Sequence, residues 1–256
     1  MNWNDLLDQL RSFLGGGEDT AAFASHDGLL LTLLLLSVPM TVGLAMSIPL
    51  AFARNARRAW LRMAVWLYTS LLRGTPMLVQ LFLVYYGLAQ FALVRASPFW
   101  PLLRDPLYCA LLTLTLNTAA YTTEIIAGQL RNTDRREFEA AQSLGMTTRQ
   151  VYLRIVLPAA LRRSLPAYGN EVIMLLHGTA IVSLVTLTDL TGVARHIYAD
   201  TYNPFTPFMV AGGFYLALTW LLVKAFGLME ARWLAYLNYP NYLKPGDADQ
   251  ATKSSI

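Results

Sequence analysis

Five apolar stretches dominate this chain, and each is long enough to cross a membrane as a helix. They lie at 28–53, 76–94, 106–128, 168–188 and 205–223. A helix needs about 20 mainly apolar residues to cross the roughly 30 Å of hydrocarbon in a bilayer. With 55% hydrophobic and 14% charged residues, the chain has too little polar surface for an ordinary soluble domain. The sequence therefore predicts an all-α, polytopic membrane protein with five transmembrane helices.

The segment before the second stretch, 56–73, is also apolar but contains Arg62. If it ran on into 76–94, the resulting helix would be far longer than the bilayer is thick. The intervening residues Arg73-Gly74-Thr75-Pro76 are typical of a helix break. We therefore expect 56–73 to form a basic helix at the membrane interface and the crossing to begin after Pro76.

Arginine placement predicts the direction of the chain through the membrane. Arginines gather in the first and third connections, at Arg54, Arg57, Arg58, Arg62, Arg131, Arg135, Arg136, Arg149, Arg154, Arg162 and Arg163. The positive-inside rule places these connections in the cytoplasm, the N-terminus outside and the C-terminus inside. The expected domains are an outer segment 1–25, a membrane domain 26–238 and a disordered cytoplasmic tail 239–256. The net charge of +4 follows from this topology, so the expected contact is membrane lipid and no nucleic-acid partner is implied.

The third connection, 129–166, is the most polar part of the membrane domain. Asp134, with Glu137 three residues later, resembles a capping box that begins a helix lasting to about Leu144. Gly145 can end that helix in a left-handed conformation, and a second short helix is expected to follow from about Thr148. Two short amphipathic helices would form a knob at the cytoplasmic membrane surface. The same pattern is compatible with a helix that rests on lipid headgroups.

Catalytic motifs are missing from the sequence. It contains no phosphate-binding G-x-x-x-x-G-K-[ST] loop, no Cys/His cluster with metal-ligand spacing and no G-x-S-x-G nucleophile elbow. Its three histidines are scattered, and Cys109 is its one cysteine. No enzyme, metal or cofactor is therefore expected, and any ATP hydrolysis would come from another chain. A secondary transporter or channel is the other alternative, but no inverted repeat is detectable.

The polar loop also carries a family signature. Its residues Glu139, Ala140, Ala141, Gly145, Ile155, Leu157 and Pro158 match the EAA motif of inner-membrane permeases from binding-protein-dependent ABC importers. Flanking segments resemble the polar amino-acid branch of that family: 73–76 with Gln80, 116–124, 165–172 and 201–206. The likeness extends from about 28 to 236 and is strongest to M-type permeases of histidine/lysine/arginine/ornithine and opine importers.

This resemblance implies a type I importer (MetI-like) permease fold with five helices and a periplasmic N-terminus, in the bacterial inner membrane. The implied partners are a dimer of ATP-binding cassettes, a second permease subunit (Q-type or a copy of this chain) and a periplasmic amino-acid-binding protein. Glu139, Ala140, Ala141 and Gly145 would sit in a groove of the cassette. The implied function is amino-acid import, of cationic amino acids or opines, driven by the partner's ATP hydrolysis.

Polar side chains within the spans are candidates for the substrate pathway, because an ionisable group at membrane depth usually faces a cavity or a partner. Asn117, Tyr121 and Glu124 share one face of the third helix at helical spacing, and Asn170, Glu171 and His177 lie in the fourth. Carboxylates would bind amino or guanidino groups. Structural alternatives remain open: Glu124 could pair with Arg73, Glu171 could pair with Arg162 or Arg163, and His177 could be a packing residue.

The outer connection between the last two spans is rich in polar and turn residues. It contains Asp189, Arg195, Asp200 and Tyr202. The family resemblance implies that these residues dock the binding protein. An ordinary hydrated loop is the alternative, since loops are generally polar.

Overall fold

The structure is a computed structural model that describes residues 12–14 and 28–234. Within these residues the elements are all helical. In chain order they are α2 (Leu29–Arg54), α3 (Ala59–Gly74), α4 (Met77–Phe82), π-helix η1 (Leu83–Gly87), 3-10 helix η2 (Leu88–Gln90), α5 (Ala92–Arg95), α6 (Trp100–Leu103), α7 (Pro106–Arg131), α8 (Arg135–Ser143), α9 (Thr148–Val151), π-helix η3 (Tyr152–Val156), α10 (Leu157–Thr179), 3-10 helix η4 (Ala180–Val185), α11 (Leu190–Thr201) and α12 (Phe205–Trp233). The all-α prediction is confirmed for the described part of the chain.

Three helices of the described chain are long and apolar enough to cross a membrane. They are α2, the continuous helical stretch Thr148–Val185 that includes α10, and α12. The pair Ala59–Gly74 and Met77–Gln90 passes the same test when it is taken as one bent span, which raises the number to four. The expected span 205–223 lies inside α12, which ends later than hydropathy indicates. The helical stretch that contains most of 168–188 begins earlier than expected, at Thr148, and ends at Val185, so 186–188 lie beyond it.

Helix α7 covers the expected span 106–128 but is not among these apolar helices. Twelve of its 26 residues are buried, and five of those are threonines. The helix packs against α2, α3 and α10, so most of its surface meets protein. Small and polar residues are common where membrane helices pack closely. The sequence expectation of a third crossing thus corresponds to a central helix whose polar residues face its neighbours.

The second expected span, 76–94, is not one straight helix. α3 and the following helical segment meet at an angle of 106°, and the segment continues as the short helices α4, η1, η2 and α5. Pro76 lacks a backbone N–H and disfavours a helical conformation at Thr75, which is extended with ψ 145°. α3 itself, expected at the interface, packs beside α2 and α7, and the Tyr68 hydroxyl donates to the Leu116 carbonyl at 2.7 Å.

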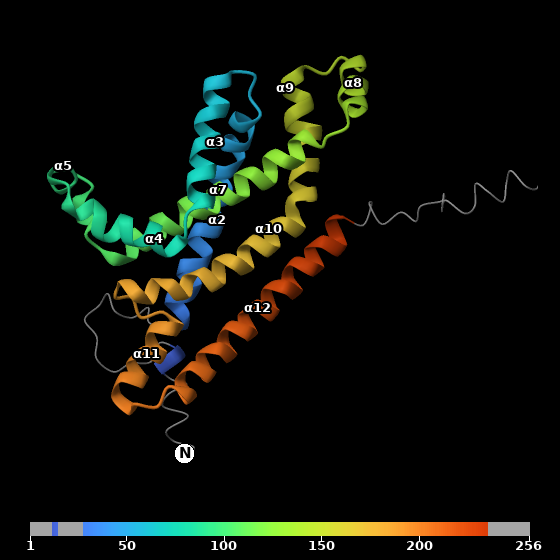
Figure 1. Cartoon of the computed structure of the whole chain (residues 1–256). Helices are drawn as coiled ribbons and strands as arrows, with labels where there is room; N and C mark the ends of the chain where they lie inside the picture. The colour runs from blue at the N-terminus through green and yellow to red at the C-terminus, as the bar shows by residue number, and fades with distance from the viewer. Residues whose placement is uncertain (1–11, 15–27, 235–256) are drawn as a thin grey trace, which may run out of the picture.

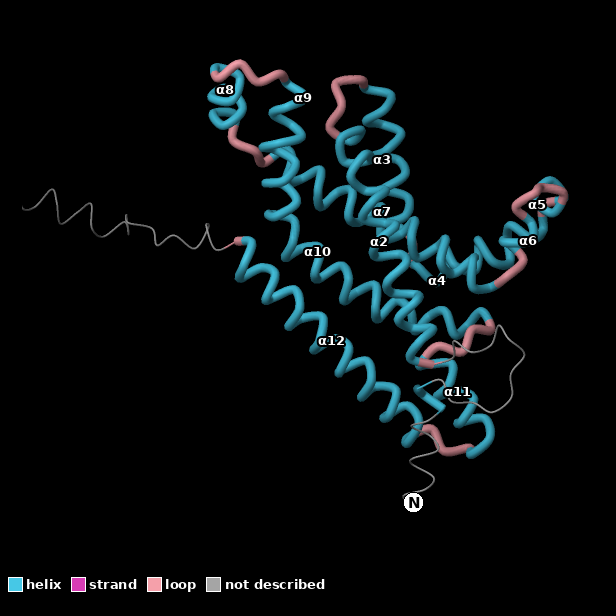
Figure 2. Tube along the Cα trace, turned by 180° about the vertical axis from the view of Figure 1, so that it is seen from behind, coloured by secondary structure: helices cyan, strands magenta, loops and turns pink. Residues whose placement is uncertain are grey.

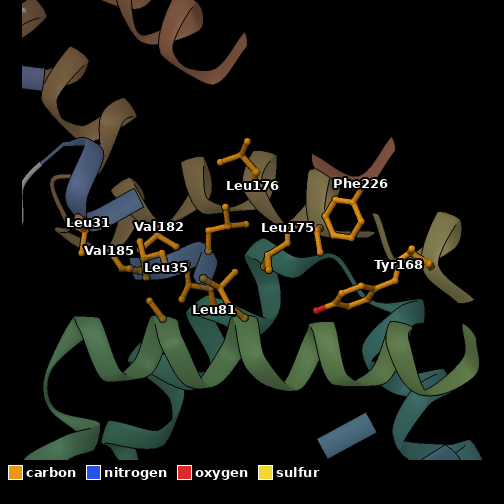
Figure 3. Packing of buried hydrophobic residues seen from close by; sticks show 14 residues of the cluster. Leu31, Leu35, Leu81, Tyr168, Leu175, Leu176, Val182, Val185 and Phe226 are labelled. Atoms are coloured by element: carbon orange, nitrogen blue, oxygen red, sulfur yellow. The ribbon is translucent and has the colours of Figure 1, made fainter. Parts of the chain in front are cut away.

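The main apolar core joins α2, α4, α7, α10, η4 and α12 (Figure 3). Leu35, Leu176 and Val182 in it are fully buried. The Tyr168 hydroxyl reaches across to α2 and donates to the Met40 carbonyl at 2.8 Å. Next to it, a Cβ at Gly169 would lie 2.9 Å from the Phe226 ring, so glycine permits the close approach of α10 and α12.

The molecule has two distinct ends (Figures 1 and 2). One end carries α8, α9 and the beginning of α3, and α11 lies at the opposite end. We call these the α8 end and the α11 end. The helices α2 and α10 extend between them, while α4 and α5 project sideways from the break after α3.

Candidate functional site

The polar loop at the α8 end folds as two helices separated by a glycine turn. Asp134 caps α8 by accepting a hydrogen bond from the Arg136 N–H at 2.9 Å. Gly145 adopts φ 80°, the left-handed conformation expected from the sequence, and its N–H donates to the Gln142 carbonyl. Thr147 and Gln150 then form a capping box that begins α9. This local geometry favours glycine at 145, because most side chains disfavour positive φ.

The residues of the EAA signature divide into an exposed and a buried group. Glu139, Ala140 and Gly145 are exposed, and nothing lies within 4 Å of a Cβ built on Gly145. Ala141 is only 4% exposed and packs with Val151 and Val156 in a small core of the loop. The expectation that Ala141 contacts a cassette groove is therefore replaced by an internal role. Its small side chain lets α8 pack closely on the following helix.

Sequence reasoning missed Leu144, which is 84% exposed beside Gly145. An apolar side chain at the tip of a polar loop is the signal that could have identified it. The remaining residues of the signature lie where the loop joins α10: Ile155 belongs to η3, and Leu157 and Pro158 begin α10. All three are partly buried. They join the loop to α10 within one continuous helical stretch, Thr148–Val185.

A second feature is a cavity of about 380 Å³ between the α3–α4 break, α7 and α10. Four of the six predicted pathway residues line it: Asn117, Tyr121, Glu171 and His177. Thr75 and Thr118 add hydroxyl groups, and Met174 and Ile181 contribute apolar surface. Glu124 and Asn170 are not among the lining residues.

Glu124 is held by a structural ion pair. Its Oε1 accepts from Arg54 Nε at 2.7 Å and from the Thr69 hydroxyl at 2.8 Å. Both charged side chains are mostly buried, at 18% exposed for Arg54 and 15% for Glu124. The pair joins α2, α3 and α7. The alternative partner Arg73 instead lies over the ring of Tyr121, with its guanidinium carbon 5.2 Å from the ring centre.

Glu171 differs from Glu124, because it makes no hydrogen bond or ion pair with another described residue. The suggested partner Arg163 donates elsewhere, to the Gln129 carbonyl and the Thr133 hydroxyl. Arg162 is exposed. A half-buried carboxylate without a direct partner in the described chain is thus available to the cavity. His177 reaches Thr219 of α12 at 3.3 Å, so it serves packing as well as the cavity wall.

The buried amide of Gln80 fixes how Asn117 faces this cavity. Gln80 is 7% exposed, and its Nε2 donates to the Leu72 carbonyl at 2.7 Å and to the Thr75 carbonyl at 3.0 Å. Carbonyl oxygens only accept, so Gln80 must turn its NH₂ group toward them and its oxygen toward Asn117. Asn117 Nδ2 donates to that oxygen at 3.0 Å. The Asn117 oxygen is consequently left as the atom that can accept from a ligand.

The predicted docking residues at the α11 end do not share one environment. Asp189 is 0% exposed and caps α11, accepting from the Gly192 N–H at 2.9 Å and from the Tyr215 hydroxyl at 3.0 Å. Burial raises the pKa of Asp189 from its ordinary value of 3.8 to about 6, while these hydrogen bonds act in the opposite direction. Asp189 is therefore an internal residue rather than part of a docking surface.

Arg195, Asp200 and Tyr202 of the same segment are exposed. Arg195 also donates to the Ser183 carbonyl at 3.0 Å, and Tyr202 is 84% exposed. These three residues remain candidates for a protein-facing surface at the α11 end.

Comparison with known proteins places this geometry in a family. The family model "Binding-protein-dependent transport system inner membrane component" matches residues 30–234. The histidine/lysine/arginine/ornithine transport system permease protein HisM of Escherichia coli K12 is 42% identical over 211 residues, covering 82% of this chain and 89% of the relative. The nopaline transport system permease protein NocM of Agrobacterium fabrum is 40% identical over 203 residues, covering 79% of this chain and 83% of the relative.

Solved structures agree with the sequence relatives. A crystal structure of an amino acid ABC transporter with histidines matches with a TM-score of 0.75 and 30% identity, covering 91% of this chain and 99% of that one. The MetNI methionine ABC transporter in an inward-facing conformation matches with a TM-score of 0.67 at 16% identity, which supports the fold alone. The chain therefore belongs to the family of binding-protein-dependent transport system inner membrane components, and it is a multi-pass protein of the inner membrane.

Proposed function

We propose that this chain is the pathway subunit of an ATP-driven importer for amino acids, and that its substrates are cationic amino acids or opines. The observation that carries the proposal is the cavity containing Glu171 and Asn117. Glu171 supplies a carboxylate without a direct partner among the described residues, and Asn117 supplies an amide oxygen. Ammonium and guanidinium groups carry only donors, so they require such acceptors. Relatives named as histidine/lysine/arginine/ornithine and nopaline permeases support the same substrate class.

The remaining predicted pathway residues have different roles in this proposal. The Tyr121 and Thr75 hydroxyls line the cavity and donate to the Arg73 and Leu71 carbonyls, at 3.5 and 2.8 Å respectively. His177 forms part of the cavity wall. Glu124 positions the helices around the cavity through Arg54. Asn170 is exposed on α10, and its part in the pathway rests on the sequence pattern.

The two-helix loop is the proposed attachment point of the ATP-binding cassette. Glu139, Ala140 and Gly145 are exposed together on it, and Leu144 adds an apolar contact. The carboxylate of Glu139 suits charge-assisted hydrogen bonds from a partner, and the small Ala140 allows close helix approach. Because the loop continues into α10, movement of the cassette would be transmitted to the helix that carries Glu171.

The arrangement of the ends follows from this assignment. By the positive-inside rule, the arginine-rich connections support a cytoplasmic α8 end, and the α11 end would then face the periplasm. Arg195, Asp200 and Tyr202 would then meet the amino-acid-binding protein. A second permease subunit, either Q-type or a second copy of this chain, completes the pathway, and a cassette dimer supplies ATP hydrolysis.

The substrate assignment can be tested with Glu171→Gln in the complete transporter reconstituted into proteoliposomes. We expect the KM for uptake of arginine or lysine to rise about tenfold, because a charged hydrogen bond of about 1.5 kcal/mol is lost. Stimulation of ATP hydrolysis by the loaded binding protein should persist. Glu230→Gln on α12, outside the cavity, is the matched control. Unchanged uptake by Glu171→Gln at low substrate would refute the role of this carboxylate.

A further inference from the structure

A larger cavity, of about 1000 Å³, opens at the α8 end between the α2–α3 connection and the two-helix loop. It lies between the two groups of helices that project at this end in Figure 1. We propose that this cavity binds the phosphate group of an anionic phospholipid headgroup.

Four arginines line the cavity: Arg54, Arg57, Arg62 and Arg131. Aspartate and glutamate are absent from the described residues that line it. The positive charge of the four arginines is therefore only partly balanced, and the balancing groups lie outside the cavity. The cavity favours an anion over a cation or a neutral ligand.

The four arginines are not equally engaged with the protein. Arg54 is paired with Glu124 through its Nε, and Arg131 donates to the Asn55 side chain at 3.1 Å. Arg57 and Arg62 are exposed and form no ion pair with another described residue. Arginine presents a planar fork of donors that matches the oxygens of a phosphate. Arg57 and Arg62 are thus the side chains available to hold one.

The apolar part of the wall favours a lipid over a free phosphate. Phe52 at the end of α2 and Phe138 of α8 both pack edge-to-face on Tyr152, with ring centres 6.1 and 5.7 Å apart. An inorganic phosphate has no apolar surface to bury against this wall, whereas the glycerol and first methylene groups of a lipid can cover it. Trp60, just after the arginine-rich connection, is 67% exposed, as expected for an aromatic residue at a membrane interface.

The position of the cavity gives a bound lipid a role in coupling. Phe138, Gln142 and Thr148 come from the two-helix loop, while Arg57 comes from the α2–α3 connection and Arg62 from the first turn of α3. A headgroup bound by residues from both sides would hold the loop at a fixed distance from α2. The lipid would therefore stabilise the orientation in which α8 is presented.

Binding can be measured directly on the complete transporter, purified with its cassettes and placed in nanodiscs. The discs contain phosphatidylcholine alone or equal parts of phosphatidylcholine and phosphatidylglycerol, and retained phosphatidylglycerol is quantified by native mass spectrometry. The double variant Arg57→Gln/Arg62→Gln should retain phosphatidylglycerol about 25-fold more weakly, at about fivefold for each arginine near a membrane surface. The matched control Arg58→Gln/Arg149→Gln removes the same charge from residues outside the cavity and should retain it as the unaltered chain does.

Three results would overturn the proposal. Equal loss of phosphatidylglycerol in both double variants would show that net charge alone attracts the lipid. Saturable binding of inorganic phosphate in phosphatidylcholine discs, with no preference for phosphatidylglycerol, would assign the cavity to a free phosphate. If the difference between the two double variants appears without cassettes and disappears when they are bound, the cassette occupies the cavity. The measurement is independent of substrate identity, so its failure would leave the proposed transport function untouched.

Discussion

The side chain of Gln80 holds the break between α3 and α4 together, and replacing it should affect both stability and substrate recognition. In Gln80→Leu, the carbonyls of Leu72 and Thr75 lose the Gln80 donor, which leaves Leu72 only the longer bond from Asn117 at 3.5 Å, and Asn117 loses the acceptor that orients it. Leucine has a similar size, so the change removes hydrogen bonds while it largely keeps the volume.

The magnitude follows from the number of groups left unpaired. Four polar groups lose a partner: the Leu72 and Thr75 carbonyls, the Thr75 hydroxyl oxygen and the Asn117 amide. Water can replace the partner of the hydroxyl oxygen, and each of the other three groups costs about 1–3 kcal/mol when nothing replaces its partner. Because Thr75 is exposed, water can reach part of this site, and the lower figure applies. We therefore expect a loss of about 3 kcal/mol in the free energy of unfolding. In addition, the freed Asn117 amide can rotate, which removes its fixed acceptor from the cavity.

Two measurements check this prediction on the purified protein. Equilibrium unfolding in mixed micelles reports the stability, and uptake kinetics of the reconstituted transporter report KM and kcat separately. We expect lower stability and a raised KM with a smaller effect on kcat. Gln90→Leu in η2, an exposed glutamine, is the matched control. The reasoning fails if Gln80→Leu has the stability of the unaltered chain and the same KM.

Three further predictions concern other parts of the molecule. Gly145→Pro should insert normally but uncouple ATP hydrolysis from transport, because proline fixes φ near about −65° whereas this position has φ 80°. Gly145→Asn should retain coupling. Normal transport by a well-expressed proline variant would contradict the role of the turn. Glu124→Gln should destabilise the chain by about 2 kcal/mol, because it weakens the interaction with Arg54. A double-mutant cycle with Arg54→Gln should give a coupling energy well above zero. Additive effects of the two substitutions would argue against the pair. Asp189 binds its proton more tightly in the folded state, so the free energy of unfolding should fall as pH rises from about 4 to about 6. Asp189→Asn should lack this pH dependence. The same pH dependence in both proteins would contradict the burial argument.

The general architecture and the two-helix loop were predictable from the sequence because their signals are local. Apolar length predicts membrane helices, and the left-handed turn at Gly145 follows from the properties of glycine alone. The helical structure of the second span was harder to predict from the sequence. Its short helices and the 106° bend depend on Gln80 satisfying carbonyls of the preceding helix, which is a tertiary interaction.

The candidate site residues show the same division. Spacing groups Asn117 and Tyr121 on one face of α7, and both residues line the cavity. It could not reveal that Glu124 pairs with Arg54, since those residues are 70 positions apart. Likewise, the polar composition around Asp189 predicted exposure, but Tyr215 of α12 buries that carboxylate. Contacts between distant helices decided each of these outcomes.

Amino-acid uptake into proteoliposomes, measured with and without the partner cassettes, tests the central claim most directly. The chain, its partner permease and the loaded binding protein are held constant, and labelled arginine is followed with ATP present or absent inside. We predict accumulation only when both cassettes and ATP are present. Accumulation of arginine by the permease subunits in the absence of cassettes would contradict the account.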